Sequence, residues 1–237
     1  MIAREGLTIV AVAAVIAFVL AVLGLRLEIG WGRPALLLAA VGILGFTLYF
    51  FRDPDRTPPE EGRAGRALLA PADGRVVEVV EETDSVYLNG PVQRVSIFLS
   101  PLDVHVNRVP TNGVVEHAEY RPGDYLVAWH PKASDRNERS EIGIRHPSGT
   151  KVLFKQIAGA VARRIVYHVR EGDTVQAGER FGIVKFGSRM DVIVPPDIPL
   201  SVEEGESVRA GESVLGRLPA PGVFDDAEHR VGADLET

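Results

Sequence analysis

The fold is decided by a short pattern that occurs twice, Glu171-Gly172-Asp173-Thr174-Val175-Gln176-Ala177-Gly178-Glu179 and Glu204-Gly205-Glu206-Ser207-Val208-Arg209-Ala210-Gly211-Glu212. Each glycine suits a turn with positive φ, and each central valine is expected to point inward from the strand that follows. Two such β-hairpin units that face each other predict a small flattened barrel.

Lipoyl- and biotin-carrier domains are similar to this arrangement and carry a modified lysine on the connecting hairpin. Here the connection contains Gly187-Ser188, and the nearest lysine, Lys185, lacks the Asp-Lys or Met-Lys context. We therefore expect lipoyl-like duplicated units without a carrier function. A Gly-Ser bond on an exposed, tight hairpin is instead the arrangement that a self-cleaving serine needs.

The remaining chain after residue 66 contains short β runs separated by turn residues. The candidate strands are 75–80, 94–99, 113–118, 140–145, 152–157, 164–169, 181–186 and 191–194. Only 157–164 indicates a helical turn, and 60–66 indicates a loop. The pattern predicts a mainly β domain, either a sandwich or a flattened barrel.

The N-terminus contains two apolar runs, Leu7 to Leu25 and Pro34 to Phe51. Each is close to the roughly 20 residues that a helix needs to cross a bilayer core. The linker between them carries charges, glycines and Trp31, which is typical of a membrane-surface turn. A secretory signal peptide is the alternative for the first run, but no small-residue cleavage site precedes Arg26. The sequence favours a transmembrane helical hairpin.

These patterns predict the division of the chain and its location. We expect a membrane anchor at 1–52, a linker at 53–66, a β domain at 67–218 and a loose tail at 219–237. Arg4, Arg52 and Arg56 lie on one side of the hairpin, and Arg26 and Arg33 on the other. This slight excess predicts a cell-membrane protein whose β domain is cytoplasmic.

The composition limits the chemistry. The chain has no cysteine, which excludes disulfides and thiolate ligands, and its net charge of −6 argues against nucleic acid as a partner. His117, His130 and His146 lie in or beside polar stretches, and no cluster has metal-ligand spacing, so no metal site is expected.

Several blocks in this order resemble the phosphatidylserine decarboxylases, in particular the short bacterial and archaeal form. They are Phe51-Arg52-Asp53-Pro54, Pro71-Ala72-Asp73-Gly74, Ser100-Pro101-Leu102-Asp103-Val104-His105-Val106-Asn107-Arg108 and Phe186-Gly187-Ser188-Arg189-Met190-Asp191. The resemblance covers about residues 51 to 218.

The resemblance implies an inactive proenzyme that cuts itself between Gly187 and Ser188 into associated chains 1–187 and 188–237. By resemblance, Ser188 becomes a covalent pyruvoyl group, which forms a Schiff base with the amine of a serine phospholipid and needs no external cofactor. The expected reaction is decarboxylation of phosphatidylserine to phosphatidylethanolamine and CO2 in phospholipid biosynthesis.

His105 is the best candidate for the base and proton donor, because imidazole can serve both steps near neutral pH. Asp73 is expected to orient His105 as the third member of a triad, although Asp-Gly is also a common turn signal. In the long form of the family a second histidine follows three residues later, where this chain has Arg108. Either His105 serves both self-cleavage and decarboxylation, or self-cleavage uses another base such as His168 or Asp73.

Two other functions are compatible with parts of this sequence. A related lyase could act on archaetidylserine or another serine lipid, since nothing in the sequence distinguishes a diacyl from a diether tail. A non-enzymatic membrane adaptor also pairs an anchor with a lipoyl-like barrel, but between Arg66 and Leu218 the heptad pattern of its usual long helical hairpin is missing.

Overall fold

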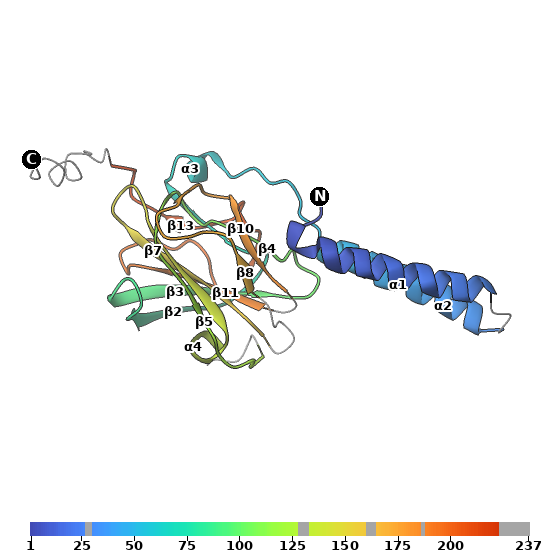
Figure 1. Cartoon of the computed structure of the whole chain (residues 1–237). Coiled ribbons are helices and arrows are strands. Elements are labelled where there is room, and N and C mark those ends of the chain that lie inside the picture. Colours follow the sequence, from blue (N-terminus) through green and yellow to red (C-terminus); the bar gives the residue numbers. More distant parts are fainter. Residues whose placement is uncertain (27–29, 128–132, 160–164, 186–187, 223–237) are drawn as a thin grey trace, which may run out of the picture.

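The computed structural model describes residues 1–26, 30–127, 133–159, 165–185 and 188–222. It consists of a β domain and a pair of N-terminal helices that projects from it (Figure 1). The helices are α1 (Leu7–Arg26) and α2 (Gly32–Phe50), and a 3₁₀ turn (Arg4–Gly6) precedes α1. Helices therefore form where the two apolar runs predict them.

The two helices expose most of their apolar side chains. Phe18, Leu38 and Val41 are 69%, 74% and 71% exposed. Only 17% and 11% of the residues in their apolar windows are buried, whereas a core helix buries a whole face. By length and composition, both helices are suited to cross a membrane.

The described part of the β domain contains three antiparallel sheets. Their strand orders are β12–β2–β3–β11–β7–β6–β5–β9, β4–β10–β8 and β1–β13. The strands are β1 (Ala67–Leu69), β2 (Gly74–Asp84), β3 (Gly90–Leu99), β4 (Val106–Arg108), β5 (Gly113–Arg121), β6 (Arg139–Arg145), β7 (Lys151–Ile157), β8 (Ile165–Tyr167), β9 (Thr174–Val175), β10 (Arg180–Val184), β11 (Ser188–Val194), β12 (Ser207–Val208) and β13 (Val214–Arg217). The predicted mainly β fold is confirmed.

The core lies against the inner face of the largest sheet. Its register aligns Val95, Val192, Phe154 and Ile142 in one row across β3, β11, β7 and β6. All four side chains are fully buried. Because side chains alternate between the two faces of a strand, the residues on either side of each row member point outward.

The duplicated units lie at opposite edges of the eight-stranded sheet. Val175 in β9 pairs with Gly113 in β5, and Val208 in β12 pairs with Gly74 in β2. Both valines are only 4% exposed. The repeat glycines have positive φ, namely Gly172, Gly178, Gly205 and Gly211. The predictions for these turns and valines are confirmed.

The two units also meet each other, which curls the sheet. A Cβ added at Gly211 would lie 3.3 Å from the Cα of Gly178. The repeated glycines are therefore needed both for the turn and for this close approach.

Two short helices differ from the sequence expectations. α3 (Glu60–Arg63) forms within the expected loop, with two glutamates in its first turn, where they suit the helix dipole. α4 (Ala133–Arg136) was not expected. Of the expected helical turn at 157–164, Ile157 belongs to β7, and residues 160–164 lie outside the described residues.

Candidate active site

Ser188 is the first residue of β11, a strand held between β3 and β7. It pairs with Leu99 and is fully buried, and its Oγ has no hydrogen-bond partner among the described residues. The expectation of an exposed serine is therefore wrong, because Ser188 already belongs to an inner strand rather than to a turn. Gly187 lies outside the described residues.

The strand topology brings His105 to the same corner. β11 begins at Ser188 beside Leu99, the last residue of β3, and β4 begins at Val106 beside Ile183 near the end of β10, so Ser188 and the connection 100–105 lie at the same end of the domain. His105 directly precedes Val106, which pairs with Ile183 at the end of β10. Ser188, 83 positions after His105 in sequence, thus begins β11 at the same end of the domain as the connection that carries His105.

The 100–105 connection begins with a tight turn that its sequence dictates. The amide of Asp103 donates to the Ser100 carbonyl at 3.0 Å, and the Asp103 carboxylate accepts from the Ser100 amide at 2.8 Å. Serine, proline and aspartate are typical residues of such a turn. This turn fixes the backbone two residues before His105.

The His105 imidazole is fully buried and has one free nitrogen. Its Nδ1 lies 3.0 Å from the Asp103 carbonyl oxygen. Because a carbonyl only accepts, Nδ1 carries the proton and Nε2 presents a lone pair. Nε2 has no partner within the described part of the chain.

The charge state of His105 follows from its surroundings. Burial lowers the pKa of His105 to about 4, and the positive charge of Arg52 adds to this. The Asp103 carbonyl contact and the charges of Asp103 and Asp73 act in the opposite direction. The imidazole is therefore neutral at pH 7, as a general base must be.

Asp73 is held by Arg56 rather than by His105. Arg56 Nη2 donates to Asp73 Oδ2 at 2.7 Å, its Nη1 contacts Oδ1, and the Ala210 amide donates to Oδ1 at 2.9 Å. Asp73 and Asp103 line one hollow of about 440 Å³. The charge of Asp73 acts on His105, but neither ring nitrogen of His105 has a hydrogen bond to Asp73. The expected direct triad contact is therefore not present in this structure, and an orienting role of Asp73 stays a prediction.

Arg108 points away from this corner. Its guanidinium donates to the Gly178 carbonyl at 2.9 Å and the Pro54 carbonyl at 2.9 Å, and it pairs with Asp53 at 3.3 Å. It therefore ties the segment after α2 to a repeat turn. His168, the other alternative base, has a 60% exposed side chain whose Nε2 lies 2.6 Å from Glu5.

Sequence reasoning missed a chain of buried polar side chains on the inner face. Ser140 Oγ donates to Gln156 Oε1 at 2.8 Å, and Gln156 Nε2 donates to Asn107 Oδ1 at 2.8 Å. Gln156 pairs with Met190 and is therefore a diagonal neighbour of Ser188 on the same face. A glutamine at an inward position between apolar residues was the signal that could have indicated it.

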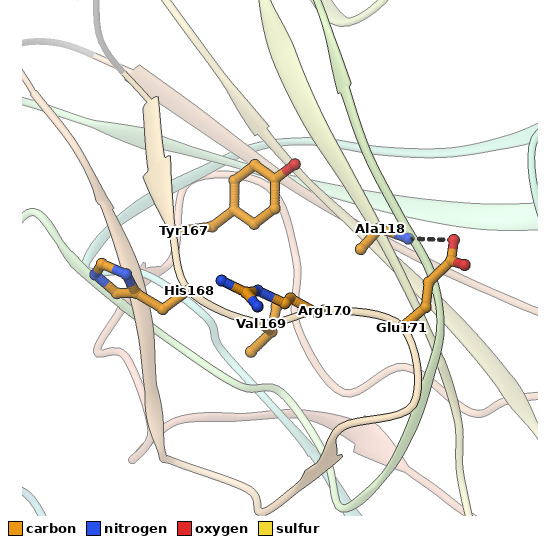
Figure 2. A pocket seen from close by; sticks show the side chains of 6 residues that line it. All are labelled: Ala118, Tyr167, His168, Val169, Arg170 and Glu171. Carbon is orange, nitrogen blue, oxygen red and sulfur yellow. Dashed lines mark hydrogen bonds between the residues drawn. The ribbon is translucent and has the colours of Figure 1, made fainter.

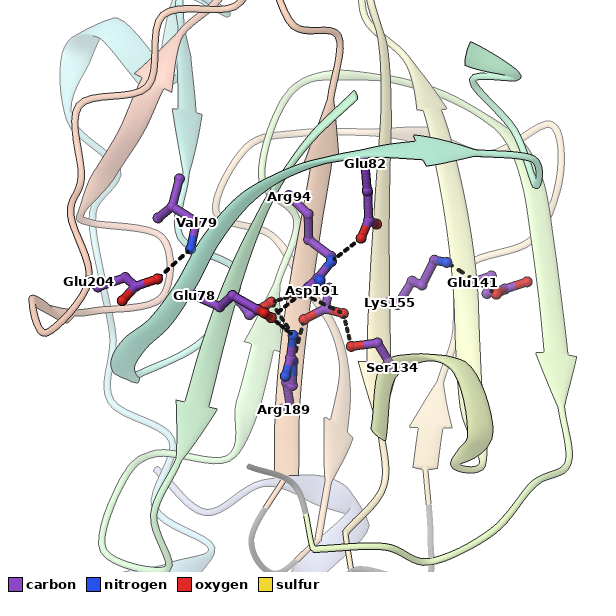
Figure 3. Close-up of polar contacts among 11 residues, drawn as sticks. Glu78, Val79, Glu82, Arg94, Ser134, Glu141, Lys155, Arg189, Asp191 and Glu204 are labelled. Atoms are coloured by element: carbon purple, nitrogen blue, oxygen red, sulfur yellow. Dashed lines mark hydrogen bonds and ion pairs between the residues drawn. The ribbon is translucent and has the colours of Figure 1, made fainter. Parts of the chain in front are cut away.

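The outer face of the eight-stranded sheet carries a buried charge network on β2, β3 and β11 (Figure 3). Arg189 donates to Asp191 and Glu78 at 2.7 Å each, and Ser134 in α4 donates to Asp191 at 2.6 Å. Burial alone raises the pKa of Asp191, but the charges of Arg189 and Arg94 and the hydrogen bonds from Arg189 and Ser134 hold it below its ordinary value. This network fixes α4 to the strand that begins at Ser188.

Two other features lie apart from this corner. A hollow of about 670 Å³ is lined by Ala118 and residues 167–171, without Ser188, His105 or Asp73 (Figure 2). His117, Glu119 and Glu141 bring ligand atoms within 4.8 Å of one another, but Glu141 already pairs with three cations, Arg121, Arg139 and Lys155.

Comparisons with known proteins agree with this geometry. The sequence model of a family described as phosphatidylserine decarboxylase matches residues 43–216. The chain is 71% identical over 192 residues to the phosphatidylserine decarboxylase proenzyme of Salinibacter ruber, covering 81% of this chain and 83% of that protein. It is 48% identical over 185 residues to the proenzyme of Chlorobium luteolum, covering 78% and 85%. It is also 48% identical over 191 residues to that of Gluconobacter oxydans, covering 78% and 84%.

Proposed function

Because this chain belongs to the phosphatidylserine decarboxylase family, we propose that it is made as a proenzyme that cuts itself between Gly187 and Ser188. The chain is a carboxy-lyase that converts phosphatidylserine to phosphatidylethanolamine and CO2. The observation that carries the self-processing proposal is the corner where Ser188 Oγ and His105 Nε2 are both buried and unpartnered among the described residues. Buried polar atoms without partners are rare, and a catalytic role is one of the reasons for which proteins retain them.

Self-cleavage uses atoms of the chain alone. Ser188 Oγ attacks the Gly187 carbonyl carbon, the peptide C–N bond breaks, and an ester joins the two residues. Loss of the Cα proton of residue 188 then breaks the Cβ–Oγ bond. This step releases chain 1–187 with a carboxylate end and leaves a dehydroalanine, which water hydrolyses to a pyruvoyl group and ammonia.

His105 moves the protons in this scheme. Its free Nε2 takes the Ser188 hydroxyl proton, and the resulting imidazolium gives a proton to the departing nitrogen. The pyruvoyl carbonyl supplies the electron sink for the C–C bond that releases CO2. His105 is then the group that returns a proton to the product carbon. Asp73 supports the charged imidazole through its negative charge.

The two chains are expected to stay associated after cleavage. Strand β11, at the start of chain 188–237, pairs with β3 on one side and β7 on the other. Its side chains are fully buried along its length. Separation would break these two strand pairings as well as those of β12 with β2 and of β13 with β1, and it would expose the core.

The corner is expected to face the membrane, with the β domain on the cytoplasmic side. Lys185, two residues before Gly187, donates to the Glu5 carbonyl at 3.0 Å and lies 5.8 Å from the Phe51 ring centroid. Glu5 lies just before the start of α1, and Phe51 directly follows the end of α2, so both lie at the end of the helix pair that adjoins the β domain (Figure 1). A hollow of about 650 Å³ at this junction, lined among others by Arg4, Val106 and Arg180, gives the lipid head group a route from the bilayer surface.

Proteolysis of liposome-bound protein tests the membrane-facing placement. With anionic liposomes present, we expect cleavage at Lys185 to be strongly slowed, because the bilayer covers this corner. Cleavage at Arg145, a 50% exposed side chain at the end of β6 opposite the Ser188 end of the sheet, serves as the internal control and should be unchanged. Equal protection of both regions, or of neither, would count against the placement.

A further inference from the structure

The last residue of α2 reaches into the candidate active site. The Phe50 ring centroid lies 4.1 Å from that of His105, with the ring planes inclined by 33°. Phe50 is 1% exposed, although most apolar side chains of its helix are exposed. Phe46, one turn earlier, is 46% exposed. The contact is therefore specific to the end of the helix.

The end of the helical hairpin is firmly docked at this position. Phe50 and Phe51 form a buried cluster with Ala3, Val104 and Val106, among others. The Ala3 amide donates to the Phe51 carbonyl at 2.9 Å. Arg52 Nη2 donates to the Leu102 carbonyl at 2.7 Å, which joins the segment after α2 directly to the connection that carries His105.

Phe50 is thus one wall of the space around the imidazole. The Asp103 carbonyl holds Nδ1, and the aromatic ring covers a face of the imidazole. The charged groups that act on His105 are Asp103 on its own connection, Arg52 after α2, and Asp73 before β2. Truncation of Phe50 would leave these charges in place and admit water to one side of the ring.

We propose that Phe50 is a positioning residue of the active site, so that the transmembrane hairpin holds the His105 ring in place and excludes water from it in addition to anchoring the chain. This proposal rests on the proposed role of His105 in self-cleavage and decarboxylation. It makes the membrane helix a structural part of the reaction site. The hairpin then cannot be exchanged for another anchor without loss of activity.

Self-cleavage separates this role from anchoring, because an intramolecular reaction needs no lipid substrate. We would synthesise the full chain cell-free in detergent and follow the appearance of chain 188–237 between pH 4.5 and 9. The variants are Phe50→Ala, Phe50→Leu and the control Phe18→Ala, which removes a 69% exposed ring of the same helical hairpin. Decarboxylation of a short-chain, detergent-soluble phosphatidylserine by the same variants gives a second readout.

Phe50→Ala is expected to move the acid limb of both pH profiles upward. Water contact returns the imidazole toward its ordinary pKa of about 6.5, so the neutral fraction at pH 5 falls by roughly 30-fold. At pH 8 the imidazole is neutral in both proteins, and the processing rates should agree within a few fold. Phe50→Leu should restore most of the acid limb, and Phe18→Ala should match the unsubstituted chain.

An unchanged acid limb in Phe50→Ala would overturn the proposal, as would the same upward shift in Phe18→Ala. A loss of equal size at every pH in both Phe50 variants would show a merely structural role and would also overturn it. His105→Ala is measured in parallel. If His105→Ala cuts itself and decarboxylates at normal rates, a negative result with Phe50→Ala is explained by an error in the proposed function of His105 rather than in the role of Phe50.

Discussion

Ser188→Ala leaves the chain uncut at its full length and without decarboxylase activity. The alanine lacks the Oγ that attacks Gly187, so neither the ester nor the pyruvoyl group can form. Because the Ser188 side chain is fully buried and makes no hydrogen bond to the described residues, its removal costs little folding energy. Intact mass and thermal unfolding in detergent should therefore show a folded, unprocessed chain with complete loss of CO2 release.

Ser201→Ala is the matched control, since Ser201 is exposed and its hydroxyl donates to the Val214 carbonyl at 3.3 Å. It should be cut and active like the unsubstituted chain. Products of 1–187 and 188–237 from Ser188→Ala would exclude Ser188 as the nucleophile. Uncut Ser188→Ala that still decarboxylates would exclude the pyruvoyl group.

His105→Ala lowers decarboxylation by about 10²–10⁴-fold, the usual contribution of a general acid or base. Self-cleavage slows as well, because the same Nε2 removes the Ser188 proton. The measurements are the rate of chain appearance and the rate of CO2 release by the processed fraction. His105→Ala also deletes the partner of the Phe50 ring, so thermal unfolding must be recorded alongside.

Two further variants identify the base for cleavage. His168→Ala should process normally, because that side chain is largely exposed and pairs with Glu5 at the surface. Asp73→Asn should slow both steps less than His105→Ala, since Asp73 acts on His105 through its charge. If cleavage and decarboxylation both survive in His105→Ala, His105 is structural and the proposed acid–base scheme is wrong.

The local sequence pattern was sufficient to predict much of the fold. The repeat glycines required positive φ, and the valines between them had to point inward; both follow from the residue types and their spacing. The alternation of apolar and polar residues likewise predicted most of the strands, including β3 and β7, which flank Ser188. The two apolar runs predicted the helices because length and composition alone distinguish such segments.

Contacts between distant residues were not predictable in this way. Asp73 pairs with Arg56 and the Ala210 amide, and Ala210 lies 137 positions away in sequence. The burial of Ser188 depends on β11 being an inner strand, which is a property of the sheet order rather than of the Gly-Ser turn. The packing of Phe50 on His105 depends on how the hairpin docks, and an apolar run carries no information about its partner.

The most direct test of self-processing is the intact mass of the purified, detergent-solubilised chain. The account predicts two chains, 1–187 and 188–237, that copurify, with the smaller one lacking a free amine at its first residue. A single intact chain from folded material that releases CO2 from phosphatidylserine would contradict it.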